Sequence, residues 1–200
     1  QGVKFDAEIS VKYKDELFKY RGELLFAKYG ISGTATLDAS RKILDYHKKP
    51  DTVISINFLP DFSQVSLGLY LDRIWKRLPQ RTLAESLSGI LNRKIPPVLL
   101  PLMHIGDINR CVSTVTLKER AIIMEKLLNW KIDVKGGRPF TEAMVTAGGI
   151  STSDVDPNTM ESRLTKGLYL AGEILDIDAL SGGFNLQFAF STGWIAGKAE

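Results

Sequence analysis

Alternating apolar and polar residues mark the first part of the chain. Over Val3–Val11 every second residue is apolar and those between are charged or polar, which is typical of a strand with one buried face. Phe18–Phe26 is predicted to be its hairpin partner, and Asp51–Leu59, rich in Val and Ile, to be a further strand. Thr34–Leu44 is predicted to be a helix. We therefore expect residues 1–62 to form a β-rich unit with one helix.

The pattern changes to helical spacing in the middle of the chain. Leu and Ile recur three or four residues apart over residues 63–128, and such a stripe forms a core far more often than a ligand site. Thr116 is followed three residues later by Glu119, which is the capping-box pattern, so a helix is predicted from Thr116 to Leu128. Residues 63–128 are expected to form a helical bundle.

The last third of the chain combines short apolar runs with many glycines. Strand character returns at Trp130–Val134 and again at Ala143–Ala147. Residues 129–143 are therefore expected to be the return strand of the β-rich unit, and residues 144–200 to form a separate closing segment.

The first chemical signal is an apolar run that ends in a glycine and an acid. Leu168–Ala171 lies between Gly167 and Gly172, and Glu173 follows. In doubly wound sheets, ligands bind beyond the carboxyl ends of the strands, where glycine allows close approach to the backbone. A carboxylate at that position can accept a hydrogen bond from a ribose or ribityl hydroxyl. A buried strand followed by an ordinary turn explains the same pattern without a ligand.

A glycine pair and an apolar helix follow. Gly182-Gly183 precedes a helix predicted from Asn185 to about Ala199. One face of this helix carries small residues, which indicates close packing: Ala189, Gly193, Ala196 and Gly197. The other face carries large residues and is expected to fill a core: Leu186, Phe190 and Trp194. The free amides and the dipole at the helix start suit phosphates, carboxylates or the pyrimidine edge of a reduced flavin.

Composition and charge exclude several other classes. The formal net charge of +3 is mild, and Lys and Arg are mixed with acids and not interleaved with aromatic residues, so no nucleic-acid partner is expected. Cys111 is the one cysteine, and no Cys/His cluster exists to hold a metal. No apolar run has the length of a membrane span, and the low cysteine count leads us to expect a cytoplasmic protein.

The glycine-rich segments resemble a known family of proteins. They are similar to the BaiN/YhiN-type bacterial flavoproteins, which include aminoacetone oxidase and are NAD(P)/FAD-dependent oxidoreductases. The resemblance is carried by Leu24–Arg41 and, most specifically, by Ala143–Ile150, Val155–Ser162, Gly167–Asp178 and Gly182–Gln187.

This resemblance implies a fold and a set of cofactor-binding residues. The implied fold is a mixed α+β and α/β one, in which a β-rich substrate domain with an inserted helical bundle precedes the closing segment of a glutathione-reductase-type FAD-binding fold. Glu173 resembles the acid that binds the FAD ribityl chain. The expected cofactor-binding residues are Gly172, Glu173, Gly182, Gly183, Asn185, Leu186 and Gln187. NAD(P)H is a candidate electron donor, and the expected substrate is a small organic molecule.

The chain departs from the family in two respects. It contains no G-x-G-x-x-G, the motif that cradles the pyrophosphate, so we expect an amino-terminal FAD-binding segment to be missing and the chain to be inactive alone. Phe184 stands where the family often has tyrosine, so no acid is assigned there. Catalytic residues stay unknown, with Arg41 and His47 as weak candidates. The alternative is a non-catalytic binding module that folds without cofactor.

Overall fold

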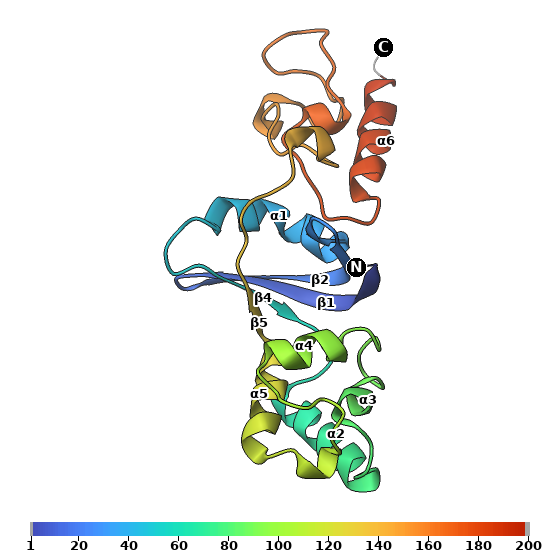
Figure 1. Ribbon diagram of the computed structural model, residues 1–200. Coiled ribbons are helices and arrows are strands. Elements are labelled where there is room, and N and C mark those ends of the chain that lie inside the picture. The colour runs from blue at the N-terminus through green and yellow to red at the C-terminus, as the bar shows by residue number, and fades with distance from the viewer. Residues whose placement is uncertain (1, 199–200) are drawn as a thin grey trace. The chain divides into compact units, whose positions relative to one another are not determined.

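A computed structural model describes residues 2–198 of the chain. These residues form two compact units, one that ends at Gly136 and one that begins at Gly137 (Figure 1). The domain boundaries expected from the sequence, at 62/63, 128/129 and 143/144, stay predictions. We describe each unit by itself.

The first unit is built on an antiparallel sheet. The strands are β1 (Val3–Tyr13), β2 (Glu16–Ala27), β3 (Gly30–Ser32), β4 (Val53–Asn57) and β5 (Trp130–Ile132), in the order β3-β2-β1-β4-β5. The β1–β2 hairpin runs in unbroken register from the Val3–Phe26 pair to the Tyr13–Glu16 pair. The predicted strands in Val3–Val11, Phe18–Phe26, Asp51–Leu59 and Trp130–Val134 are confirmed.

Helix α1 (Thr34–Tyr46) covers one face of the sheet, as predicted, and glycine makes its approach close (Figure 1). Gly33 has a φ of 94°, and a Cβ at this position would lie 2.2 Å from the carbonyl oxygen of Glu23. Only glycine therefore fits between β2 and the helix start. The helix buries Ala35, Ala39 and Ile43 against the apolar face of β1, most of which is buried.

Helices occupy the chain between β4 and β5. They are α2 (Gln64–Arg77), α3 (Leu83–Leu87), α4 (Pro96–Leu102) and α5 (Leu117–Leu128), with a 3-10 turn, η1 (Val112–Thr114), before α5. Their apolar stripes are buried, which confirms the core interpretation of the Leu and Ile spacing; the fully buried side chains include Leu67, Leu71, Leu83, Leu87, Leu100, Ile123 and Leu127.

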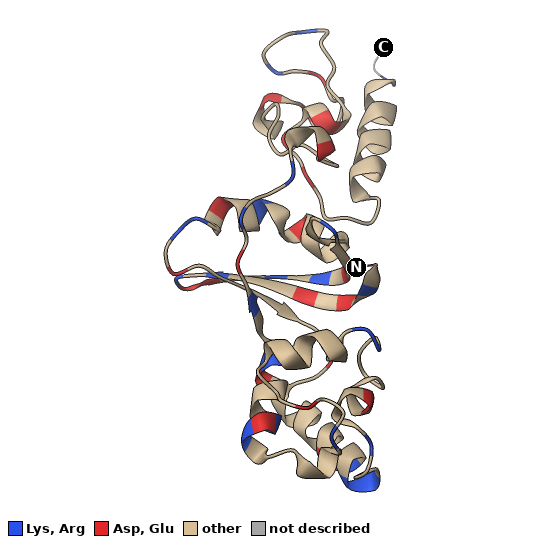
Figure 2. Ribbon diagram, viewed as in Figure 1, with Lys and Arg blue, Asp and Glu red and all other residues tan. Residues whose placement is uncertain are grey.

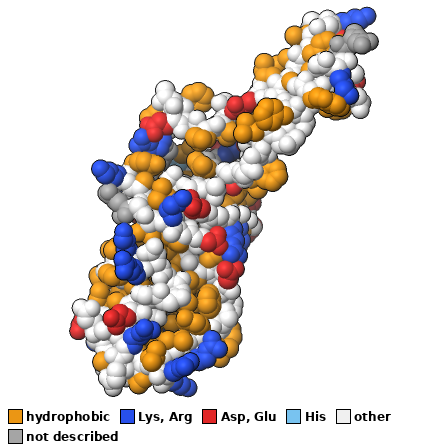
Figure 3. Space-filling view, turned by 90° about the vertical axis from the view of Figure 1, so that its right-hand side faces the viewer, with side chains coloured by type: hydrophobic (Ala, Val, Ile, Leu, Met, Phe, Trp, Pro, Cys, Tyr) orange, Lys and Arg blue, Asp and Glu red, His pale blue; other side chains and the backbone are white. Residues whose placement is uncertain are grey.

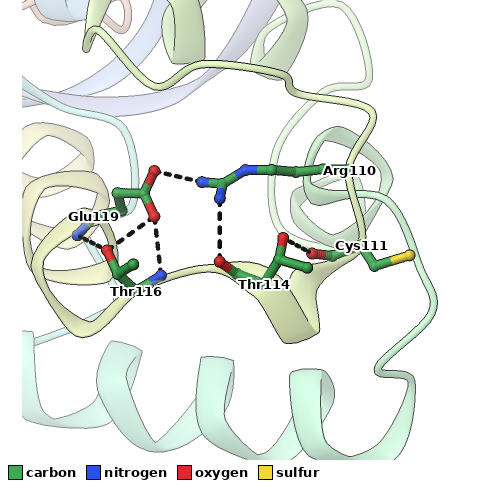
Figure 4. Close-up of polar contacts among 5 residues, drawn as sticks. All are labelled: Arg110, Cys111, Thr114, Thr116 and Glu119. Carbon is green, nitrogen blue, oxygen red and sulfur yellow. Dashed lines mark hydrogen bonds and ion pairs between the residues drawn. The ribbon is translucent and has the colours of Figure 1, made fainter.

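The capping box predicted at the start of α5 is present. The Thr116 hydroxyl accepts the Glu119 N–H at 3.2 Å, and a Glu119 carboxylate oxygen accepts the Thr116 N–H at 2.9 Å. Arg110 pairs with the other carboxylate oxygen of Glu119 and donates to the Thr114 carbonyl (Figure 4). This network satisfies two of the free amides at the helix start, those of Thr116 and Glu119.

The second unit has little regular secondary structure. Its helices are η2 (Phe140–Glu142), η3 (Thr152–Asp154), η4 (Gly172–Ile174) and α6 (Phe184–Ala196), and its β pairing is limited to isolated bridges. The expected strands at Ala143–Ala147 and Leu168–Ala171 are wrong. Tyr169 makes one bridge, to Glu161, and no named strand lies among the described residues 137–198. An apolar run becomes a strand only where a partner chain extends beside it.

No helix within residues 2–198 is both long enough and apolar enough to cross a membrane.

Candidate functional site

Two backbone segments of the second unit lie against each other. Ile150 N–H donates to the Ile174 carbonyl at 2.8 Å, and Asp176 N–H donates to the Ile150 carbonyl at 2.9 Å. A Cβ on Gly149 would lie 2.6 Å from the Ile174 oxygen and under 3 Å from two further backbone atoms. Gly149 is therefore required for the two segments to approach so closely.

Glu173 joins the same two segments through its side chain. Its Oε1 accepts the backbone N–H of Thr146 at 2.8 Å, and its side chain is exposed. Its Oε2 makes no hydrogen bond to any atom of residues 2–198. An ionised carboxylate can accept several hydrogen bonds, so one half of Glu173 is held in place while the other half remains open to a ligand donor.

Gly172 is fixed to helix α6. Its N–H donates to the Thr192 hydroxyl at 2.9 Å, and that hydroxyl donates to the Phe188 carbonyl at 2.8 Å. Gly172 has a φ of 74°, and a Cβ there would meet Ala189 at 3.5 Å. The expected close packing of small residues is thus confirmed at Ala189, whereas Gly193 has no neighbour within 4 Å of a Cβ.

The start of α6 is shaped by Gly183 and Asn185. Gly183 is left-handed, with φ of 93°, and the helix begins at Phe184 without a side-chain cap. The side-chain amide of Asn185 makes two hydrogen bonds to the backbone of Ala179. It accepts the Ala179 N–H at 2.9 Å and donates to the Ala179 carbonyl at 3.1 Å. Asn185 therefore holds the loop before the helix through two hydrogen bonds to Ala179.

The packing face of α6 differs from the expected one. Leu186, Phe190 and Trp194 were expected to fill a core, but they are 65%, 72% and 64% exposed. The helix packs instead through Phe188, Thr192 and Ile195. The expectation is wrong because α6 is apolar on all sides, so its sequence does not single out one inward face. Hydrophobic side chains are accordingly exposed on this unit (Figure 3).

Comparison with known proteins identifies the group to which the chain is related. The sequence pattern of the HI0933-like protein Rossmann domain matches residues 4–199. The chain belongs to this family. HI0933-like proteins are FAD-binding oxidoreductases of the flavoprotein class, found in bacteria.

Three curated relatives extend this assignment. The chain is 32% identical over 200 residues to a Clostridium scindens protein named 3-dehydro-bile acid delta(4,6)-reductase, an alignment that covers 99% of the chain and 49% of the relative. It is 31% and 27% identical to proteins named ribosomal RNA dihydrouridine synthase from Escherichia coli and Haemophilus influenzae, covering 88% of the chain and 41% of each relative. The chain thus spans about half the length of the HI0933-like relatives that it matches, or less.

The described residues fit part of the flavin cofactor of the HI0933-like family. Glu173 offers an open carboxylate oxygen, Gly172 gives close access to the backbone, and α6 begins at a glycine, Gly183, with the positive end of the helix dipole. These groups suit a hydroxylated chain and an electron-rich ring edge. The fit does not extend to the pyrophosphate, because the chain has no G-x-G-x-x-G.

The structure brings some of the residues expected at the site together, whereas others make contacts elsewhere or face outward. Gly172 and Glu173 lie in one turn, and the Thr192 hydroxyl links that turn to α6. Gln187 donates to Ser191 on its own helix at 3.0 Å, and the Leu186 side chain faces outward. Gly182 and Gly183 are exposed, with positive φ. Three residues that position the turn were not expected from the sequence: Thr146, Gly149 and Thr192.

The first unit holds a separate cavity of about 240 Å³. Its walls are aromatic and aliphatic, with two carboxylates at one side; the lining includes Phe5, Phe58, Phe62, Leu59, Ile90, Asp6 and Asp61. Arg21 bonds both carboxylates, through contacts of 2.8 Å to Asp61 and 2.6 Å to Asp6. Asp61 first, and then Asp6, raises the pKa of the Arg21 guanidinium, so this cation stays charged.

The weak catalytic candidates gain no support. The Nδ1 of His47 lies 3.1 Å from the Leu44 carbonyl at the end of α1, and its Nε2 is buried without a partner among the described residues. In residues 2–198 no group of three or more His, Cys, Asp or Glu could hold a metal. Arg41 is not among the residues that line the cavity of the first unit, so catalytic residues stay unassigned.

Proposed function

We propose that this chain belongs to a BaiN-like, FAD-dependent reductase and supplies the turn and helix start that hold the flavin end of the cofactor. The observation that carries the proposal is the half-open Glu173 carboxylate beside Gly172, fixed on one side to Thr146 and on the other to α6. These groups would orient the cofactor, and bound FAD would supply the redox chemistry.

The names of the relatives favour reduction of a carbon–carbon double bond. One is a delta(4,6)-reductase, and dihydrouridine is uridine with two hydrogens added. In the proposed reaction the substrate alkene gains one hydride and one proton, and NAD(P)H as electron donor is oxidised to NAD(P)⁺. The α6 start would stabilise negative charge on the reduced cofactor, because its amides and dipole are preorganised.

A second part of the proposal concerns the exposed side of α6. A helix that is apolar all round is normally buried on all sides. Leu186, Phe190 and Trp194 form a continuous apolar stripe at i, i+4 and i+8. We propose that this stripe packs on a further segment of the FAD-binding fold, since the chain spans 49% of the length of the Clostridium scindens relative.

The proposed substrate is a small organic molecule with an alkene conjugated to a carbonyl, and the cytoplasm is the proposed location. The cavity of about 240 Å³ in the first unit, with three phenylalanines in its lining, has the size and apolar character for a ring system of modest size. The second candidate substrate is a uridine in ribosomal RNA, which is favoured by the names of two relatives.

Anaerobic reoxidation tests the proposal. The complete protein is purified, its flavin is reduced chemically, and an enone steroid or ribosomal RNA is added while flavin absorbance is followed. The proposal expects a flavin spectrum at one FAD per chain and reoxidation by one of the two substrates. A complete protein without flavin would instead favour the non-catalytic binding module.

A further inference from the structure

We propose that a cationic cluster at the end of α2, formed by Arg73, Lys76, Arg77 and Arg81, binds the phosphate backbone of RNA. The proposal rests on the second candidate substrate above and assigns the surface that would hold it. The mild whole-chain charge led to the expectation of no nucleic-acid partner. That charge is unevenly divided along the chain.

The helical segment carries the positive charge. Residues 63–128 contain ten Lys and Arg against five Asp and Glu, a formal charge of +5, whereas the remaining residues carry 16 against 18, a charge of −2. An excess of cations confined to one part of a protein is the electrostatic signature of a polyanion partner. Figure 2 shows Lys and Arg at the far end of the helical segment.

Local contacts use up the acids of this segment. Asp72 pairs with Arg120 at 3.0 Å, Glu125 pairs with Lys126, and Glu119 pairs with Arg110 while capping α5 (Figure 4). Glu85 accepts the Thr82 hydroxyl, and Asp107 accepts the Asn109 N–H. Three of the five acids therefore pair with cations outside the cluster, and the other two bond neutral groups of nearby residues.

The cluster itself is exposed and unpaired. Lys76 and Arg77 lie three and four residues after Arg73, which places all three on one face of α2. Arg81 follows in a turn whose backbone is fixed, because its carbonyl accepts the Val112 N–H at 2.9 Å. All four side chains are exposed, and none has an ion pair within residues 2–198. Lys and Arg side chains are also visible at the lower end of the molecule in Figure 3.

The aromatic rings near the cluster are not free to stack on bases. Trp75 is buried, and its indole N–H donates to Ser86 at 3.1 Å. The Tyr70 ring packs on Phe62 and lies under the Arg73 guanidinium. Cations without stacking platforms contact phosphates, which position an RNA without reading its sequence. The partner is therefore the backbone of a structured RNA.

The test uses the complete protein, a fluorescein-labelled RNA hairpin and a salt series measured by fluorescence anisotropy. The cluster variant is Arg73→Gln, Lys76→Gln, Arg77→Gln and Arg81→Gln together. The control removes four exposed cations elsewhere in the same unit, with the same change of net charge: Lys12→Gln, Lys14→Gln, Lys48→Gln and Lys131→Gln. Circular dichroism verifies that both variants are folded.

We expect the cluster variant to bind RNA at least tenfold more weakly at low salt. Its slope of log affinity against log salt should flatten by about 0.9 for each phosphate that is no longer neutralised, and the control should retain both affinity and slope. Equal losses in the two variants, or no loss in either, overturn the proposal. Loss of binding to phosphatidylserine vesicles with RNA binding retained also overturns it, because the surface would then serve a membrane.

Flavin content and reoxidation by the enone steroid are measured on the same variants. They should be unchanged in the cluster variant, since none of the four residues belongs to the second unit or lines the cavity of the first. If the parent protein contains no flavin, the proposed function is wrong. If the parent protein contains flavin and the cluster variant binds RNA as tightly as the parent, only this inference is wrong.

Discussion

The two units differ in what holds them together. The first unit has a sheet in continuous register and one large buried core that includes Ile9, Ile56, Leu71 and Leu127. The second buries four apolar side chains, Val155, Met160, Leu170 and Leu175, and leaves the apolar stripe of α6 exposed. The first unit therefore has the core of an independent domain, whereas the second buries few apolar side chains and exposes many.

The second unit is held instead by single bonds from side chains to backbone groups. In each bond a side-chain oxygen accepts a backbone N–H. The pairs are Glu173 with Thr146, Glu161 with Gly167, Thr192 with Gly172 and Asn185 with Ala179. Such bonds fix irregular turns at which backbone groups and side chains remain accessible to ligands. The difference teaches that the scaffold and the candidate site are stabilised by separate means, so they should respond differently to substitution.

Leu-to-Ala substitutions should separate the two cores most strongly. Leu71 is fully buried in the first unit, so Leu71→Ala should lower the free energy of unfolding by about 2–5 kcal/mol. Leu170 is 9% exposed and belongs to the small cluster of the second unit. Leu170→Ala should therefore lower the free energy of unfolding by less, because the surroundings can collapse or admit water. Urea unfolding of both variants measures this difference, and equal losses would contradict the contrast between the cores.

A glycine substitution should reveal the close approach in the second unit. Gly149→Val would push Ile174 and Asp176 away from their positions, at a cost of about 1–3 kcal/mol, and should weaken FAD retention. Gly106→Ala is the control, since Gly106 has a negative φ and no atom within 4 Å of an added Cβ. Thermal unfolding and flavin content provide the readouts; full retention of FAD by Gly149→Val would argue against the packed crossing.

Removal of the Asn185 side chain, which bonds the backbone of Ala179, should have a smaller effect on stability. Asn185→Ala loses two hydrogen bonds to Ala179, at about 1 kcal/mol each, and should loosen the loop before α6. Gln187→Ala serves as the control because the Gln187 side chain bonds only Ser191 of the same helix. Limited proteolysis should cut the Asn185 variant faster near Ala179. Identical digestion of both variants would mean that these hydrogen bonds do not hold the loop.

The smallest expected effect is a pH dependence in the first unit. The Thr116 N–H, its hydroxyl and then Arg110 hold the pKa of Glu119 below its usual value. A lowered folded-state pKa stabilises the fold above the unfolded-state value, and this contribution is lost as the pH falls through the folded-state pKa. Glu119→Gln should thus be less stable than the parent at neutral pH, by under about 1 kcal/mol, and equal to it in acid. A difference that persists in acid would refute this cause.

Sequence patterns predicted the scaffold better than the site. The period-two alternation of Val3–Val11 and the Thr116 capping box depend on nearby residues, so they could be predicted locally. The inward face of α6 could not, because the helix is apolar on all sides. Glu173 was recognised from the turn that carries it, but its partner Thr146 is 27 residues away and is reached only through the fold.

The most direct test of the account is a comparison of two glutamates in the complete protein. Glu173 and Glu161 are both in the second unit, and each accepts one backbone N–H at 2.8 Å. Flavin titration should show that Glu173→Ala weakens FAD binding about ten- to a hundredfold, the effect of losing a hydrogen bond to a charged group, while Glu161→Ala retains it. Unchanged FAD affinity in Glu173→Ala, or an equal loss in both variants, would contradict the placement of the flavin at Glu173.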